Sequence, residues 1–158
     1  MHDAGVTYLR QAEPTDRPFV IEMARLACTL GEDHPLPAAD DPSVIALLPS
    51  DSDVALIASD DRGLQGAAWW HHHEPPLLNS ADNQALPELV VAVLENARGR
   101  GVGTTLVNAL AHEATGRHPA LTLNVHILNP AVRLYTRTGF RVAGAGRGWF
   151  GVAMIRLL

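Results

Sequence analysis

The segment Arg98–Thr105 combines arginine and glycine in a spacing that suits the binding of an anion. It reads Arg-Gly-Arg-Gly-Val-Gly-Thr-Thr and lies between an apolar stretch and a helical pattern. A helix N-terminus presents unpaired N–H groups and partial positive charge, and glycine lets the backbone approach an anion without a Cβ in the way. We therefore expect a pyrophosphate site, and the candidate binding residues are Arg98, Gly99, Arg100, Gly101, Val102, Gly103 and Thr104.

Two better-known glycine motifs do not describe this turn. The dinucleotide fingerprint requires G-x-G-x-x-G, and the P-loop requires G-x-x-x-x-G-K-[ST]. The spacing here is G-x-G-x-G, and the chain contains no lysine. A nucleotide-binding α/β protein is the alternative interpretation, and it would give an ATP or NAD signal in a thermal-shift screen.

The charge of the chain is divided unevenly between its two parts. The net charge is −5, but residues 1–96 hold sixteen Asp and Glu against four Arg, whereas residues 97–158 hold eight Arg against one Glu. So basic a C-terminal part indicates a local anionic ligand, while the overall charge argues against nucleic acid as a partner. A chance distribution of surface charge is the alternative.

Length and composition bound the class of protein. The 158 residues suit a single domain, residues 1–158, with one core. No apolar run approaches the ~20 residues needed to span a bilayer, and the N-terminus lacks the pattern of a secretory signal. A lone Cys28 excludes an intrachain disulfide, so we expect a soluble, cytoplasmic protein with no membrane partner.

The hydrophobic pattern predicts the elements that would position the glycine turn. The run Leu89–Leu94 is apolar without alternation, which indicates a central strand buried on both faces. Strand, helix and strand then form a βαβ unit, so Leu89–Leu94 and Leu121–Ile127 should be parallel. Further strands are expected at Val6–Leu9, Val54–Ala58, Leu64–Trp70, Phe140–Ala143 and Val152–Leu157, and helices at Phe19–Leu30, Ser43–Leu48, Val102–Gly116 and Pro130–Gly139.

Two signatures in this order resemble the GCN5-related N-acetyltransferase (GNAT) family. Its R/Q-x-x-G-x-G/A pattern is met by Arg98, Gly101 and Gly103, and Asn129–Phe140 is similar to its N-x-A-x-x-L-Y-x-x-x-G-F segment. The resemblance implies a single α/β (α+β) domain. Its sheet would be mixed and mostly antiparallel, with a central parallel pair splayed around the cofactor and about four flanking helices.

The same resemblance implies an N-acetyltransferase that moves the acetyl group of acetyl-CoA to a primary amine by direct attack. The glycine turn would bind the pyrophosphate, and the pantetheine would lie beside Val91 and Val93, whose main-chain groups can bond its amides. Asn129 would contact the cofactor arm, or serve as an ordinary helix N-cap. No metal is implied.

Candidate proton-transfer groups also follow from the resemblance. Tyr135 would be the general acid for the departing thiolate, with a core aromatic as the alternative. Glu88 would take a proton from the attacking amine, with a solvated strand-end acid as the alternative. His71, His72 or His73 could supply the base instead.

The region expected to bind the acceptor matches nothing specific. Trp69, Trp70 and His71 are expected to line its pocket, with exposed packing as the alternative. Adjacent histidines alternate direction along a strand and cannot all face one ion, so we expect no metal site. Cys28 is expected in the core, because direct transfer needs no thiol.

The charge division favours a small cationic molecule or a peptide N-terminus as the acceptor. If coenzyme A occupies the basic side, the acceptor would enter across an acidic rim. Candidate rim residues are Glu32, Asp33, Asp40, Asp41, Glu74, Asp82 and Glu88. A non-catalytic acyl-CoA-binding sensor or interaction module of the same fold is the alternative function, a longer acyl donor is a further one, and a homodimer is compatible with the sequence.

Overall fold

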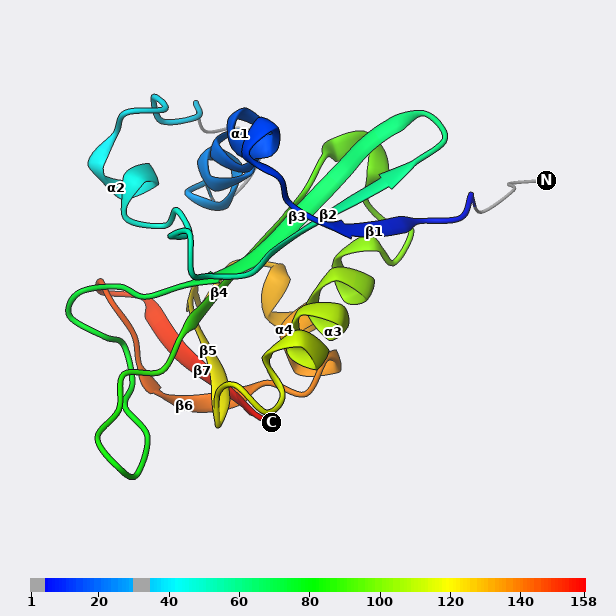
Figure 1. The fold of residues 1–158 in the computed structure, drawn as a ribbon. Helices are drawn as coiled ribbons and strands as arrows, with labels where there is room; N and C mark the ends of the chain where they lie inside the picture. The colour runs from blue at the N-terminus through cyan, green and yellow to red at the C-terminus, as the bar shows by residue number, and fades with distance from the viewer. Residues whose placement is uncertain (1–4, 30–34) are drawn as a thin grey trace.

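The computed structural model describes residues 5–29 and 35–158 (Figure 1). Expectations for Leu30, Glu32 and Asp33 lie outside these ranges, as does most of the N-terminal segment considered for a signal. The strands are β1 Tyr8–Gln11, β2 Ala55–Asp60, β3 Gly63–His71, β4 Glu88–Val93, β5 Ala120–His126, β6 Arg141–Ala145 and β7 Gly151–Leu157. The helices are α1 Arg17–Ala27, α2 Pro42–Ile45, α3 Val102–Ala114 and α4 Ala131–Arg137, with short 3-10 turns η1 Pro14–Asp16 and η2 Glu95–Ala97.

The strands form one mixed sheet. Its order is β1-β2-β3-β4-β5-β7-β6, and every neighbouring pair is antiparallel except β4 and β5, which are parallel. The βαβ interpretation is therefore confirmed, and β2 and β3 form an antiparallel hairpin. A mixed, mostly antiparallel sheet with a central parallel pair and four α-helices is the fold expected from the sequence.

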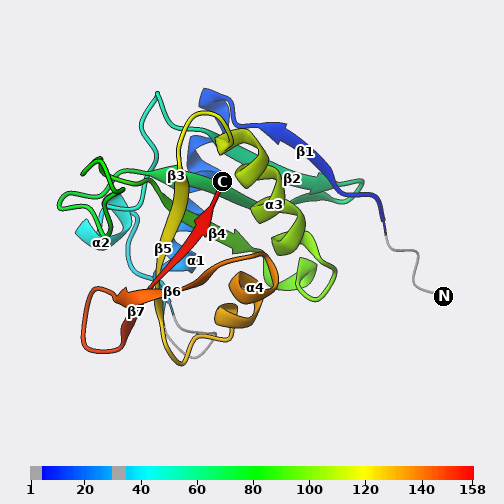
Figure 2. The same cartoon turned by 90° about the horizontal axis from the view of Figure 1, so that it is seen from below.

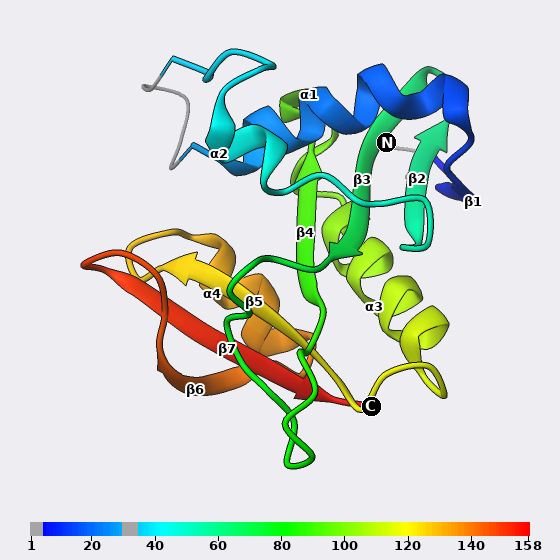
Figure 3. The ribbon, with the colours of Figure 1, turned by 60° about the vertical axis from the view of Figure 1, so that its left-hand side comes forward.

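The parallel pair separates soon after it begins. β4 and β5 share the register pair Glu88↔Thr122, where the Thr122 N–H donates to Pro87 O, and then diverge toward the carboxyl end of β4 (Figure 3). The remaining length of β4 pairs with β3 alone, from Leu89↔Trp70 to Val93↔Gly66. One edge of β4 is consequently left without a neighbouring strand.

Helices cover both faces of the sheet. α1 and α2 lie on one face, whereas α3 and α4 lie together on the other (Figures 1 and 2). The two cores divide accordingly, because β4 alternates: Val90 and Ala92 pack with α1, and Leu89 packs with α3. The expected burial of β4 on both faces is correct, although Val91 and Val93 are half-buried.

Local details differ from the expected boundaries. β1 begins two residues later than expected, and α1 ends at Ala27. The turn between β2 and β3 is tighter than expected, because Asp60 Oδ1 accepts from the N–H groups of Arg62 and Gly63 and extends both strands to the turn.

Within the described part of the chain, no helix is both long and apolar enough to cross a membrane.

Candidate active site

A cleft of about 1460 Å³ opens where β4 and β5 diverge. The whole length of β4 lines it, as do the glycine turn before α3, parts of α4 and the end of α1. It therefore runs from the helix N-terminus at one end to the α1 and α2 side of the sheet at the other.

The free edge of β4 presents backbone groups to this cleft. The Leu94 N–H donates to Gln65 O on the β3 side, and the Thr122 N–H of β5 donates to Pro87 O. Because successive residues of a strand aim their amides at opposite edges, Val91 and Val93 direct theirs toward β5. At the level of these two residues β5 has already turned away, so their main-chain groups face the cleft.

The glycine turn has the conformation that its composition requires. Gly99 and Gly101 have φ of 75° and 80°, in the left-handed region, and open space surrounds the position of a Cβ on either. A Cβ on Gly103 would lie 3.1 Å from Leu134 Cδ2, so this glycine lets α4 pack closely against α3. Its three glycines thus place no side chain of their own over the backbone at positions 99, 101 and 103.

All but one of the predicted cofactor-binding residues of this turn line the cleft. Arg98, Gly99, Gly101, Val102, Gly103 and Thr104 line the cleft. Arg98 Nε also donates to Val93 O at 3.1 Å, which ties the turn to the end of β4. Arg100 is exposed and is not among the residues that line the cleft, and its contact with the cofactor stays a prediction. It stands between the two left-handed glycines, where the chain reverses.

Asn129 lines the cleft and also caps a helix. Its Oδ1 accepts from the Ala131 N–H at 2.9 Å, which is the geometry of an N-cap although α4 begins at Ala131. Its contact with the cofactor arm stays a prediction.

Tyr135 is buried on α4 and lines the cleft. Its ring packs edge-on against Phe140 at a centroid distance of 5.9 Å, and burial raises the pKa of its hydroxyl to about 12. The group therefore holds its proton at neutral pH, as a general acid must.

Glu88 begins β4 at the point where the two parallel strands part. It is 3% exposed, so the alternative of a solvated strand-end acid is wrong. Both carboxylate oxygens accept from the guanidinium of Arg147, Oε1 at 2.6 Å and Oε2 at 2.8 Å. This bidentate pair is the strong, directional form of a charge-assisted hydrogen bond.

Arg147 was not expected from the sequence, and the connection between β6 and β7 carries it. Its backbone N–H donates to Asn124 Oδ1 at 2.8 Å, and its guanidinium also donates to Pro75 O at 3.0 Å. The turn is tight, because a Cβ on Gly146 or Gly151 would overlap neighbouring atoms. Asn124, a polar residue between Leu123 and Val125 in the middle of β5, was the available signal.

His71 ends β3 and stands directly across from Glu88 in the register of the two strands. It is 2% exposed and lines the cleft, and its Nδ1 has no hydrogen-bond partner among the described residues. Burial lowers the pKa of its imidazole to about 4, so the ring is neutral at pH 7.

The two tryptophans do not line the cleft, which corrects their expected role in acceptor binding. Trp69 is buried between the sheet and α1, with its Nε1–H donating to Leu47 O at 2.7 Å. Trp70 is buried on the opposite face, where its ring meets His118 edge-on. Their alternation along β3 sends each into a different core.

Cys28 is half-buried: it packs against the core on the α1 side, as expected, and it also lines the cleft. Burial raises the pKa of its thiol, so the group is a neutral part of the wall at pH 7. Its Sγ lies 3.7 Å from Ser43 O of α2.

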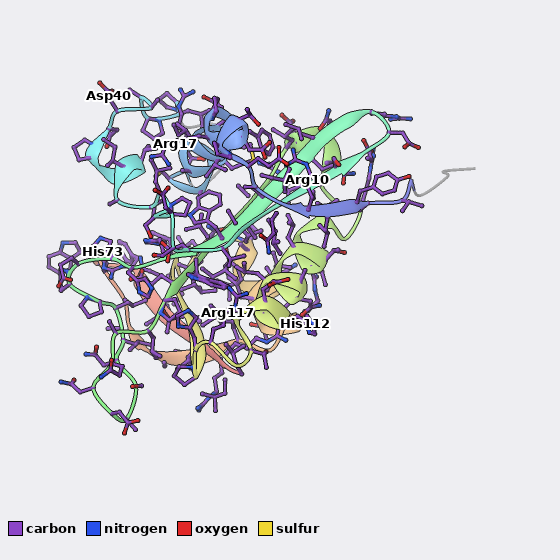
Figure 4. All side chains as sticks on the ribbon, viewed as in Figure 1. Arg10, Arg17, Asp40, His73, His112 and Arg117 are labelled. Carbon is purple, nitrogen blue, oxygen red and sulfur yellow. The ribbon has the colours of Figure 1, made fainter. Side chains whose placement is uncertain are left out.

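The residues that the structure describes do not form the expected acidic rim around the cleft. Asp40, Asp41, Glu74 and Asp82 do not line the cleft; Asp41 caps α2 through the Ser43 N–H, and Asp40 lies at the outer side of the connection into α2 (Figure 4). Glu88 lines the cleft but is neutralised by Arg147. No group of three or more His, Cys, Asp or Glu side chains in residues 5–29 and 35–158 is arranged to hold a metal ion.

Comparisons with known proteins agree with this geometry. Residues 51–142, more than half of the chain, match the family model of the acetyltransferase (GNAT) domain. A 5-NmdU N-acetyltransferase from Pseudomonas phage PaMx11 is 40% identical over 74 residues, 44% of this chain; the alignment spans about half of that relative's length.

Solved structures extend the likeness to the whole fold. A GCN5-related N-acetyltransferase from Kribbella flavida is 25% identical, with a TM-score of 0.70 over 96% of this chain and 98% of that one. A ribosomal-protein-alanine N-acetyltransferase from Brucella melitensis is 24% identical, with a TM-score of 0.69 over 96% of this chain and 99% of that one. The chain belongs to the GNAT family of acetyltransferases.

Proposed function

We propose that this protein transfers the acetyl group of acetyl-CoA to a primary amine bound at the α1 and α2 end of the cleft. The observation that carries the proposal is the free edge of β4, where the Val91 and Val93 amides face a cleft that ends at a glycine-lined helix N-terminus.

The residues present fit acetyl-CoA as the acetyl donor. The pantetheine contains amide groups, which can bond to the β4 edge as an added strand would. Its pyrophosphate can meet the backbone N–H groups around Gly101–Thr104, where the α3 N-terminus adds partial positive charge. A volume of about 1460 Å³ exceeds the 300–1,000 Å³ usual for one ligand, which suits a donor and an acceptor together.

The chemistry is a direct transfer. The ammonium group of the acceptor first loses one proton to solvent, and the neutral amine then attacks the thioester carbonyl; the C–N bond forms, and the C–S bond breaks as the tetrahedral intermediate collapses. Tyr135 gives its proton to the departing thiolate, and a base takes one proton from the amine. Of the three histidines considered as a base, His72 does not line the cleft, and His73 lines it with its Nδ1 3.1 Å from Pro75 O. Glu88 and His71 both line the cleft and meet across β3 and β4, so they are the two candidates that we retain.

The nature of the acceptor follows from the charges of the wall. Among the described residues that line the cleft, the carboxylates are Glu88 and Glu95, and Arg147 neutralises the first. A polycation would therefore have few carboxylates with which to form ion pairs. We infer a singly charged primary amine, on a small molecule or at a peptide N-terminus.

The assay that tests this proposal measures free thiol. Incubation with acetyl-CoA and a panel of polyamine, aminoglycoside, peptide and amino-acid acceptors, at low and high salt, should release coenzyme A with at least one acceptor of the last two classes. Binding of acetyl-CoA without thiol release from any acceptor would indicate a non-catalytic binding module instead.

A pair of matched substitutions tests the donor site. Gly101 and Gly116 flank α3, both have φ in the left-handed region, and open space surrounds a Cβ on each. Gly101→Asp places a negative charge at the proposed phosphate site and should raise the Kd for acetyl-CoA at least tenfold in titration calorimetry. Gly116→Asp imposes a similar backbone change at the other end of the helix and should change it less than twofold.

A further inference from the structure

We propose that His71 accepts the proton of the attacking amine, while Glu88 is held by Arg147 as a positioning residue. This inference rests on the proposed acetyl transfer and assigns its base. It depends on which of two neighbouring cleft groups is free to react.

Glu88 is committed to a structural contact. Both of its oxygens accept from Arg147, whose guanidinium also donates to Pro75 O. Protonating a carboxylate that is 3% exposed would leave this guanidinium without its counter-charge. Each turnover would then have to break the contact that joins β4 to the connection between β6 and β7.

His71 has the opposite properties. Its Nδ1 is buried and has no hydrogen-bond partner among the residues described, and such a group in a folded protein calls for an explanation. The residue is paired with Glu88 across β3 and β4, so both side chains leave the same face of the sheet. A ring at this place can meet an amine that enters from the α1 side.

The surroundings of His71 let it act as a base at neutral pH and accept charge during the step. Burial keeps the ring neutral, and His73 and Arg147 also oppose its protonation. Glu88 and Asp53 favour the charged form, so an imidazolium formed in the cleft has a carboxylate beside it. A weak base is sufficient, because the nitrogen becomes far more acidic once it has bonded to the carbonyl carbon.

The step balances as follows. The amine nitrogen forms the C–N bond, its proton moves to the imidazole, the C–S bond breaks, and Tyr135 protonates the thiolate. The amide and coenzyme A leave, His71 releases its proton to solvent, and Tyr135 takes one back. No additional reactant is needed.

The decisive experiment compares two adjacent histidines. His71→Gln should lower kcat about a hundredfold or more, the usual contribution of general base catalysis, with the Kd for acetyl-CoA unchanged. His72→Gln is the matched control: His72 lies outside the cleft wall, 3.7 Å from Asp53, and its loss should change kcat less than twofold. Imidazole added to His71→Gly should restore turnover in proportion to its concentration.

Other outcomes would overturn the assignment. It fails if His71→Gln keeps the wild-type kcat, if it changes the acceptor KM alone, or if Glu88→Gln loses a hundredfold in kcat at normal acceptor KM. Rescue by imidazole separates lost chemistry from lost folding. If the wild-type protein itself releases no thiol, the proposed function fails, and the result is distinguishable from a wrong base.

Discussion

Two arginine–carboxylate pairs of similar geometry lie in different parts of this molecule. Arg10 donates to both oxygens of Asp16, at 2.5 and 2.8 Å, and Arg147 donates to both oxygens of Glu88, at 2.6 and 2.8 Å. The first pair joins β1 to the start of α1, away from the loop that carries His73 (Figure 4). The second lies in the cleft.

The contexts of the two pairs differ more than their bonds do. Arg10 and Asp16 are six residues apart, the arginine side chain is 45% exposed, and Asp16 also accepts from the Glu13 N–H at the start of η1. Arg147 and Glu88 are 59 residues apart, and the arginine side chain is 32% exposed. The local pair joins near neighbours in the sequence and completes a turn. The distant pair holds the connection between β6 and β7 against the cleft.

The largest expected effect comes from removing the cleft arginine. Arg147→Met leaves the buried carboxylate of Glu88 without its partner and should lower the free energy of unfolding by about 2 kcal/mol, less than for a fully buried pair because the guanidinium is partly exposed. Arg10→Met, the matched change, should cost about 1 kcal/mol or less. Urea denaturation measures both.

Equal losses in the free energy of unfolding, or a larger loss for Arg10→Met, would contradict this difference between the two pairs. A double variant tests the buried pair further. Glu88→Leu with Arg147→Met removes both charges and should recover most of the lost stability, because apolar replacements of a buried pair are often neutral. It should not recover the acceptor KM, since the positioning contact stays absent.

A second prediction separates chemistry from stability within the cleft. Tyr135→Phe deletes one hydroxyl and keeps the ring that packs on Phe140, so stability should change by less than about 0.5 kcal/mol. Turnover should fall at least about tenfold, because the leaving thiolate loses its proton donor, while the affinity for acetyl-CoA stays nearly constant. Steady-state kinetics with titration calorimetry tests this, and unchanged turnover would remove Tyr135 from the mechanism.

The fold and one end of the cleft were predictable from sequence because their signals are local. The glycine spacing near Gly101 predicts a left-handed backbone conformation, and the apolar run of β4 predicts that the strand is buried. The Asn129 cap is likewise a contact of near neighbours. Each depends on residues a few positions apart, where pattern and structure correspond closely.

The acceptor end was not predictable in the same way. The pairing of Glu88 with Arg147 depends on how two segments 59 residues apart meet, which no local pattern contains. Four of the residues expected at an acidic rim, Asp40, Asp41, Glu74 and Asp82, lie away from the cleft for a related reason. Charge counted along the chain says little about which side chains face one cleft. Trp69 and Trp70 entered the core because a strand buried on both faces offers no exposed side for aromatic residues.

The smallest expected effect is a pH dependence at the local pair. The hydrogen bond from Arg10 lowers the pKa of Asp16 to about 2 from an ordinary value of 3.8. A carboxyl whose pKa falls on folding stabilises the protein above its unfolded pKa, and this contribution is lost as the pH drops from about 3.8 through about 2. Because the Arg10 side chain is 45% exposed, solvent screening reduces the effect to about 1 kcal/mol. Asp16→Asn should therefore lower stability relative to wild type at pH 7, and the difference should shrink toward pH 2. Thermal unfolding at both pH values measures it, and a difference that stays constant with pH would show that the pair contributes no ionic stabilisation.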